Sequence, residues 1–192
     1  MSNIAIFASG SGTNAENLIS YFSNEKNDRV AIVLSNNPEA FVLERAKRLS
    51  VATSVFDRDQ FYASDKVLQV LTGNSIDFIV LAGFLWLVPA NIIRAYNNRI
   101  VNIHPALLPK YGGKGMYGER VHRAVIENGD RESGITIHYV NEIYDAGNII
   151  FQARCQVAKG ETADTLATKV HELEYKYYPG VVEGIIRELN DK

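Results

Sequence analysis

The sequence has almost none of the residues that build disulfide, zinc or membrane proteins. Its one cysteine, Cys155, cannot close an internal disulfide, and no Cys-x-x-Cys pair is present to hold a structural zinc. No apolar run approaches the ~20 residues that a membrane helix needs, and the N-terminal MSNIAIFASG lacks the basic start of a signal peptide. These absences predict a cytoplasmic protein that neither crosses a membrane nor depends on disulfides.

An excess of charge of one sign is also lacking. Lys and Arg number 20 and Asp and Glu 22, for a net charge of −2 at pH 7. A protein that neutralises many phosphates carries a basic excess, so we expect no nucleic-acid partner. The hydrophobic share of 46% is close to the globular average, and 192 residues fit one domain with its own core.

Short apolar runs alternate with segments of helical period through the first hundred residues. The expected strands span residues 3–8, 30–34, 52–56, 77–82 and 100–104, and the expected helices 14–22, 41–49, 60–71 and a short one opened by Pro89. Strands that are apolar throughout and separated by helices are typical of a parallel sheet covered on both faces. This pattern predicts an α/β, doubly wound sheet.

The pattern changes after Pro105. Residues 135–140 and 149–157 read as two strands that would pair antiparallel, after a helix over 119–128. A long helix is expected from Thr162, with Pro179 kinking or breaking it. Its expected apolar face is formed by Leu166, Val170, Leu173 and Tyr177.

A glycine-rich loop, Ser9–Asn14, follows the first strand. Its glycines let the backbone approach a ligand, and the following helix N-terminus offers free N–H groups, which suits a phosphate. The third glycine of the dinucleotide fingerprint and the Gly-Lys-Ser/Thr of a P-loop are both missing. The loop therefore indicates either one small phosphate-bearing ligand or an ordinary capped turn.

Asn102 and His104 lie two apart on a strand, so they project to the same face. They end that strand where open α/β sheets bind ligands, and they offer an amide donor and an imidazole that titrates near neutral pH. Asp145, in the loop between the last two strands, is a turn former unless the loop meets His104. His138 is either a support of this site or a core residue.

The other histidines, His122 and His171, fall on expected helices and are predicted to be surface or structural residues. The four histidines have no carboxylate or cysteine at ligand spacing, so no metal site is expected. Ser9 and Ser11 lack a G-x-S-x-G setting, which disfavours a serine hydrolase.

These segments together resemble the phosphoribosylglycinamide formyltransferase family. ASGSGTN, FIVLAGF, NIHPALLPKY, GITIHYV and YDAG stand in the family's order and cover nearly the whole chain. The resemblance implies a Rossmann-like formyltransferase fold: a mostly parallel twisted sheet with helices on both faces and an antiparallel C-terminal strand pair. It also implies one domain over 1–192, with a phosphate-binding half of about 1–100 and a folate and catalytic half of about 101–192.

The resemblance implies an activity as well. A formyl group would pass from 10-formyltetrahydrofolate to the amine of 5'-phosphoribosylglycinamide, a step of de novo purine biosynthesis, without a metal. The partners would be these two small molecules, in a monomer or homodimer. The catalytic residues would be Asn102, a protonated His104 and Asp145, with His138 behind them.

Two further groups of residues follow from the resemblance. The implied ribonucleotide contacts are Ser11, Gly12, Thr13, Asn14 and Glu174. The implied folate contacts are Leu85, Trp86, Leu87, Val88, Asn102, Tyr144 and Asp145. The chain departs from the family pattern in an apparent insertion at Gly113–Gly118, in Trp86 where bacterial relatives often carry Arg, and in Ala146–Asn148 where Gly-Gly-Pro is common.

Three alternatives stay open. Methionyl-tRNA formyltransferase shares the donor but has a C-terminal RNA-binding domain, for which 192 residues leave no room. Formyltetrahydrofolate deformylase has an extra N-terminal regulatory domain. A non-catalytic nucleotide-binding α/β module would explain the glycine-rich loop but not the Asn102, His104 and Asp145 set.

Overall fold

A computed structural model describes residues 1–25 and 27–191, in which seven strands form one sheet. The strands are β1 (Ser2–Phe7), β2 (Asp28–Ser35), β3 (Ala52–Val55), β4 (Phe78–Leu81), β5 (Ile100–His104), β6 (Glu132–Tyr139) and β7 (Ile149–Gln156). Their order in the sheet is β3-β2-β1-β4-β5-β6-β7. The first five pair in parallel, whereas β6 pairs antiparallel with both β5 and β7. The predicted mixed α/β sheet is confirmed.

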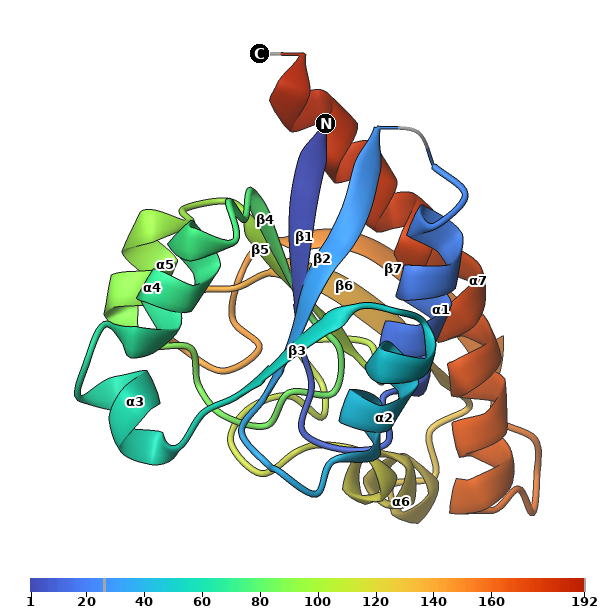
Figure 1. Ribbon diagram of the computed structural model, residues 1–192. Coiled ribbons are helices and arrows are strands. Elements are labelled where there is room, and N and C mark those ends of the chain that lie inside the picture. The colour runs from blue at the N-terminus through green and yellow to red at the C-terminus, as the bar shows by residue number, and fades with distance from the viewer. Residues whose placement is uncertain (26, 192) are drawn as a thin grey trace.

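Helices cover both faces of the sheet. They are α1 (Thr13–Phe22), α2 (Phe41–Arg48), α3 (Arg58–Tyr62), α4 (Lys66–Gly73), α5 (Ala90–Ala95), α6 (Glu119–Glu127) and α7 (Ala163–Asn190). One face carries α3, α4 and α5, and α1, α2 and α7 lie on the other (Figure 1). Among the described residues, no helix combines the length and the apolar character needed to cross a bilayer.

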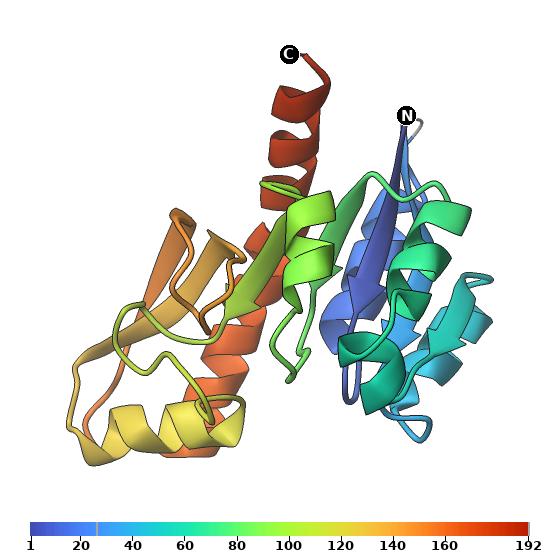
Figure 2. The same cartoon turned by 90° about the vertical axis from the view of Figure 1, so that its left-hand side faces the viewer.

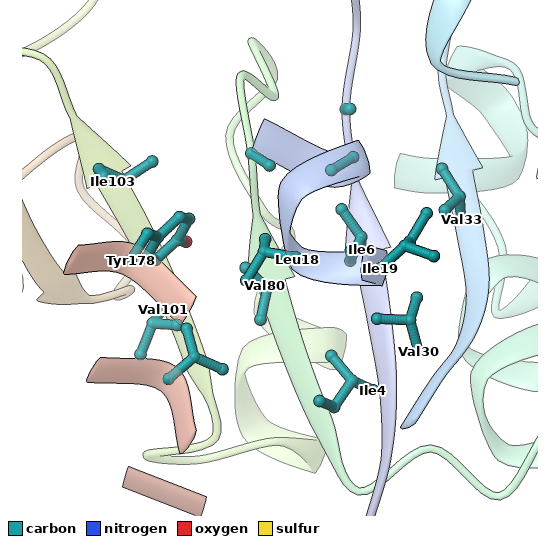
Figure 3. Close-up of a cluster of buried hydrophobic side chains, with 14 of the residues drawn as sticks. Ile4, Ile6, Leu18, Ile19, Val30, Val33, Val80, Val101, Ile103 and Tyr178 are labelled. Atoms are coloured by element: carbon teal, nitrogen blue, oxygen red, sulfur yellow. The ribbon is translucent and has the colours of Figure 1, made fainter. Parts of the chain in front are cut away.

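The core lies in two layers because β1 is covered on both sides. Ile4 and Ile6 face α1 and α7, together with Val80 of β4 (Figure 3), whereas Ala5 and Phe7 face the opposite layer. Side chains alternate along a strand, so burial of both faces requires the unbroken apolar run seen in the sequence.

The predicted helix over residues 60–71 is wrong, because the chain forms two helices there. Asp57 caps α3 by accepting from the backbone N–H of Gln60, whose side chain in turn accepts from the N–H of Asp57. The Ser64 hydroxyl then donates to the Gln60 carbonyl and accepts from the backbone N–H of Lys66. Such side-chain bonds compete with the helical ladder and separate α3 from α4.

Pro179 does not break the long helix, contrary to that part of the prediction. The ring removes the backbone N–H that would serve the carbonyl of Tyr175. The side-chain amide of Asn17 in α1 donates to that carbonyl at 3.0 Å instead. The helix α7 therefore runs continuously to the end of the molecule where both chain ends lie (Figure 2).

The buried face of α7 is shifted from the predicted one. Leu166 and Val170 are buried as expected, but Leu173 and Tyr177 are only partly buried. Tyr178 is fully buried, and its hydroxyl donates to the carbonyl of Leu81 at 2.9 Å. This bond ties α7 to the end of β4, next to the site described below.

Candidate active site

A cavity of about 710 Å³ opens at the carboxyl ends of β1, β4 and β5. Parallel strands end together at one edge, and this edge is the usual ligand site of an open α/β sheet. The cavity is lined by residues 10–14 after β1, residues 82–85 after β4, residues 102–105 of β5 and its end, residues 113–119, His122, Tyr144, Asp145 and four residues of α7.

Asn102 is half-buried at the floor of this cavity, and His138 fixes its amide. Antiparallel pairing places His138 of β6 opposite Asn102 of β5. Nδ1 of His138 lies 2.9 Å from the carbonyl oxygen of Tyr139 and donates to it, because a carbonyl can only accept. Nε2 then accepts from the Asn102 amide at 3.1 Å. His138 thus lies directly behind Asn102 and fixes its orientation.

His104 is 3% exposed and has a defined partner on each side of its ring. Its Nε2–H donates to the carbonyl of Tyr111 at 2.8 Å, and Nδ1 lies 3.6 Å from Oδ2 of Asp145. Burial lowers the pKa of His104 by more than Asp145 and the Tyr111 carbonyl raise it. The lowered pKa favours the neutral ring in the ligand-free protein near pH 7 over the expected protonated imidazole.

Asp145 lies between His104 and His138. The loop that carries it therefore does meet His104, as a functional role for Asp145 requires. Besides its contact with His104, its Oδ1 lies 3.6 Å from Nε2 of His138, and its Oδ2 accepts from the backbone N–H of Gly113 at 2.9 Å. Burial would raise the pKa of Asp145, but the His138 and His104 rings, which attract the carboxylate when they are protonated, and the Gly113 N–H, which donates to it, hold this pKa below its ordinary value. The carboxylate is therefore ionised.

The loop that carries Asp145 passes close to the backbone of Tyr139 at Gly147. A Cβ on Gly147 would overlap the carbonyl oxygen of Tyr139, so this position requires glycine.

The apparent insertion Gly113–Gly118 lines the cavity and contacts Asp145 through Gly113. Residues 113–118 therefore form part of the wall of the cavity.

The expected ribonucleotide residues meet at the other end of the cavity. Gly12, at φ 76°, starts α1, and among the described residues no side chain caps this helix. Oε2 of the buried Glu174 accepts from the Asn14 amide and contacts Nδ1 of His171, both at 2.8 Å. Ser11 and Thr13 line the same wall, so residues 160 positions apart form one surface.

Two histidines that the sequence predicted to be surface or structural residues also line the cavity. His122 is buried against the cavity, and His171 stands at its rim with 51% of its side chain exposed. Hydrogen bonding to Glu174 raises the pKa of His171, whereas burial lowers that of His122. The i, i+3 spacing of His171 and Glu174 on one helix was the available signal for His171. No local pattern marks His122.

The expected folate residues divide between two adjoining spaces. Leu85 lines the main cavity, and a smaller hollow of about 50 Å³ is lined by Trp86, Leu87 and Val88. Asn102, Tyr144 and Asp145 border both spaces. The Trp86 ring also packs in an aromatic cluster with Phe56, Phe61 and Tyr62. Within residues 1–25 and 27–191, no three His, Cys, Asp or Glu side chains are grouped to hold a metal ion.

Comparison with known proteins gives consistent matches. The profile of the family described as formyl transferase matches residues 2–182. A chloroplastic phosphoribosylglycinamide formyltransferase of Arabidopsis thaliana is 39% identical over 96% of this chain, and that of Bacillus subtilis is 31% identical over 97%. The chain spans 95% of the Bacillus subtilis protein but only 65% of the Arabidopsis thaliana protein and 61% of its Vigna unguiculata counterpart.

Solved structures agree with these matches. The crystal structure of phosphoribosylglycinamide formyltransferase from Bacillus halodurans superposes with a TM-score of 0.86 at 37% identity, covering 96% of this chain and 95% of that one. That of Streptococcus pneumoniae gives 0.85 at 34% identity, covering 97% and 99%. By its sequence over residues 2–182, and with the fold to match, the chain belongs to the formyl transferase family.

Proposed function

We propose that the chain transfers a formyl group from 10-formyltetrahydrofolate to the amine of 5'-phosphoribosylglycinamide, as in de novo purine biosynthesis. The observation that carries this proposal is that Asn102, His104 and Asp145 lie together in one cavity. The N-terminus of α1 borders this cavity, and a smaller, partly aromatic hollow adjoins it. The names of the relatives support formyl transfer and phosphoribosylglycinamide as the acceptor. The continuous sheet supports a single domain.

In this proposal the two substrates approach from opposite sides. The phosphate binds the N–H groups at the start of α1, where the helix dipole favours an anion. The buried carboxylate of Glu174, together with Asn14, faces the glycinamide end of the ribonucleotide. The folate occupies the space along Leu85–Val88 and Tyr144, so its formyl group reaches Asn102.

The reaction is attack of the substrate amine on the formyl carbon, forming a C–N bond and an oxyanion. The second N–H of the Asn102 amide is directed to that oxygen, because the first is bound to His138. Nδ1 of the neutral His104 takes the amine proton, and Asp145 stabilises the resulting imidazolium. The proton then passes to the folate nitrogen as its bond to the formyl carbon breaks.

One assay separates this function from its alternatives. The protein is incubated with 10-formyltetrahydrofolate, with and without the ribonucleotide, and formylated ribonucleotide and free formate are both quantified. We expect formylated product only when both substrates are present. Formate release without acceptor indicates a deformylase, and binding of either substrate without turnover indicates a non-catalytic module.

Trp86→Ala is expected to raise the KM for the folate about tenfold, the usual scale for losing an aromatic contact, and to leave the ribonucleotide KM unchanged. Trp86 borders the hollow that also touches Asn102 and Asp145. Tyr21→Ala is the matched control, because it also removes a partly buried aromatic ring and the partners of Tyr21, Phe22 and Glu183, line neither space. An effect on the ribonucleotide alone would reverse the two binding sites.

Ribonucleotide affinity is expected to fall as the pH rises through the raised pKa of His171. The Glu174 hydrogen bond stabilises the charged ring, so the positive charge at the cavity rim is present below that pKa and lost above it. Because the ring is half exposed, the change is about two- to fivefold. Calorimetric titrations across pH measure it, and His171→Gln should lack this component. An identical pH profile in both proteins would show that the charge of His171 does not contribute to ribonucleotide binding.

A further inference from the structure

Tyr111 contacts His104 with its backbone and the far side of the loop with its side chain. It has φ 57°, a left-handed conformation that is unusual for a bulky residue. In this conformation its carbonyl accepts the Nε2–H of His104 at 2.8 Å. The half-buried phenol points away, toward residues just before β6. The strained backbone and the histidine contact therefore occur at one residue.

The phenol is anchored by Asp130. Its hydroxyl donates to Oδ2 of Asp130 at 2.9 Å, and Lys110 and Asn128 donate to the same carboxylate at 3.1 and 2.9 Å. These hydrogen bonds, that of Lys110 first, lower the pKa of Asp130, so the anchor is ionised. A second cavity of about 500 Å³, lined by Tyr111 and Asp130, lies on this side. Tyr111 also packs against the hydrophobic core, so its side chain is held by packing as well as by this hydrogen bond.

The other charged or titratable groups around His104 come from three elements and one loop. Asp145 lies in the β6–β7 loop, His138 on β6, Glu174 on α7 and His122 on α6. Asp145 faces Nδ1 of the ring, whereas the Tyr111 carbonyl is the hydrogen-bond acceptor at Nε2. The choice of ring nitrogen that carries the proton therefore depends on Tyr111.

We propose that Tyr111, anchored by Asp130, is a positioning residue that holds His104 with its proton on Nε2 and leaves Nδ1 free to take up a proton beside Asp145. This inference rests on the proposed function only for its catalytic consequence. The ring state itself is a property of the ligand-free protein. Neither Tyr111 nor Asp130 touches the reacting atoms in this proposal.

The test compares Tyr111→Phe and Asp130→Asn with the control Lys110→Met. The control removes the hydrogen bond and charge that Lys110 gives to Asp130 and leaves the Tyr111 phenol in place. We expect kcat to fall about 10- to 100-fold in the first two variants, as when a partner behind a functional histidine is lost, with both KM values within about twofold. The double variant should lose no more than either single one, because both remove one interaction. Lys110→Met should retain kcat.

Nitrogen NMR of His104, assigned with a His104→Gln variant, gives a readout that does not require activity. The wild type should show the Nε2–H form, and Tyr111→Phe should show a mixture of both tautomers and proton uptake at lower pH. Wild-type tautomer and kcat in Tyr111→Phe would overturn the proposal, as would lower stability with an unchanged tautomer. A wild type that fails to transfer formyl groups contradicts the proposed function, while the NMR result still decides the role of Tyr111.

Discussion

Asn102→Ala is expected to lower kcat by about 10²–10³-fold with little change in either KM. This is the range for removing one preorganised donor to an oxyanion. The amide is placed for that role because β5 ends at the cavity floor and His138 fixes its orientation. Substrate binding should survive, since Asn102 is one of several proposed folate contacts and the proposed phosphate contacts lie on another segment of the cavity wall.

Steady-state kinetics and thermal unfolding of the same preparation check this result. Asn91→Ala is the matched control, because Asn91 loses the same atoms and its side-chain partner, Asp65, lies outside the cavity. A large fall in thermal stability with normal kcat would make Asn102 a structural residue. A rise in one KM at constant kcat would make it a binding residue.

Gly12→Val is expected to destabilise the protein by about 2–5 kcal/mol, the sum of left-handed strain and overpacking. Gly12 has φ 76°, and a Cβ there would lie 2.7 Å from the backbone Cα of Val42, a fully buried residue of α2. Because the clash is with backbone, a rotamer change cannot relieve it. At about 2–4 °C per kcal/mol for a chain of this size, the melting temperature should fall by about 5–20 °C.

Gly10→Val is the matched control and the better probe of the phosphate. A Cβ on Gly10 meets nothing within 4 Å, and Gly10 lines the cavity. We expect near wild-type melting, weaker ribonucleotide binding and unchanged folate binding. The loss should not add to that of using an unphosphorylated riboside, because both changes remove one interaction. Full additivity would place the phosphate elsewhere, and a stable Gly12→Val protein would contradict the α1–α2 contact.

Local patterns in the sequence predicted most of the fold. The apolar runs predicted β1, β2, β4 and β5 to within about two residues, because strands buried on both faces admit few polar side chains. Alternation over residues 135–140 indicated β6, although that strand spans Glu132–Tyr139 and is buried along most of its length. Asn102 and His104 were recognised because a strand fixes which residues share a face, whatever surrounds it.

Long-range contacts decided the rest. Pro179 stays inside α7 because Asn17, more than 150 residues earlier, supplies the missing donor. Gly12 is required by the backbone of Val42 as well as by its own turn. No window of a few residues contains either partner, so local rules predicted a kink or a break at Pro179 and assigned Gly12 either to ligand approach or to an ordinary turn.

The sequence by itself determined which residues can do chemistry and at which edge of the sheet they end. Only the tertiary structure decided their state: burial lowers the pKa of His104, His122 is buried, and Glu174 joins Asn14 and His171 across the cavity. A protonation state depends on desolvation and on charges within a few ångströms, and folding brings those groups together from distant parts of the chain. Periodicity acts between neighbours in sequence, whereas the electrostatics of this site act between neighbours in space.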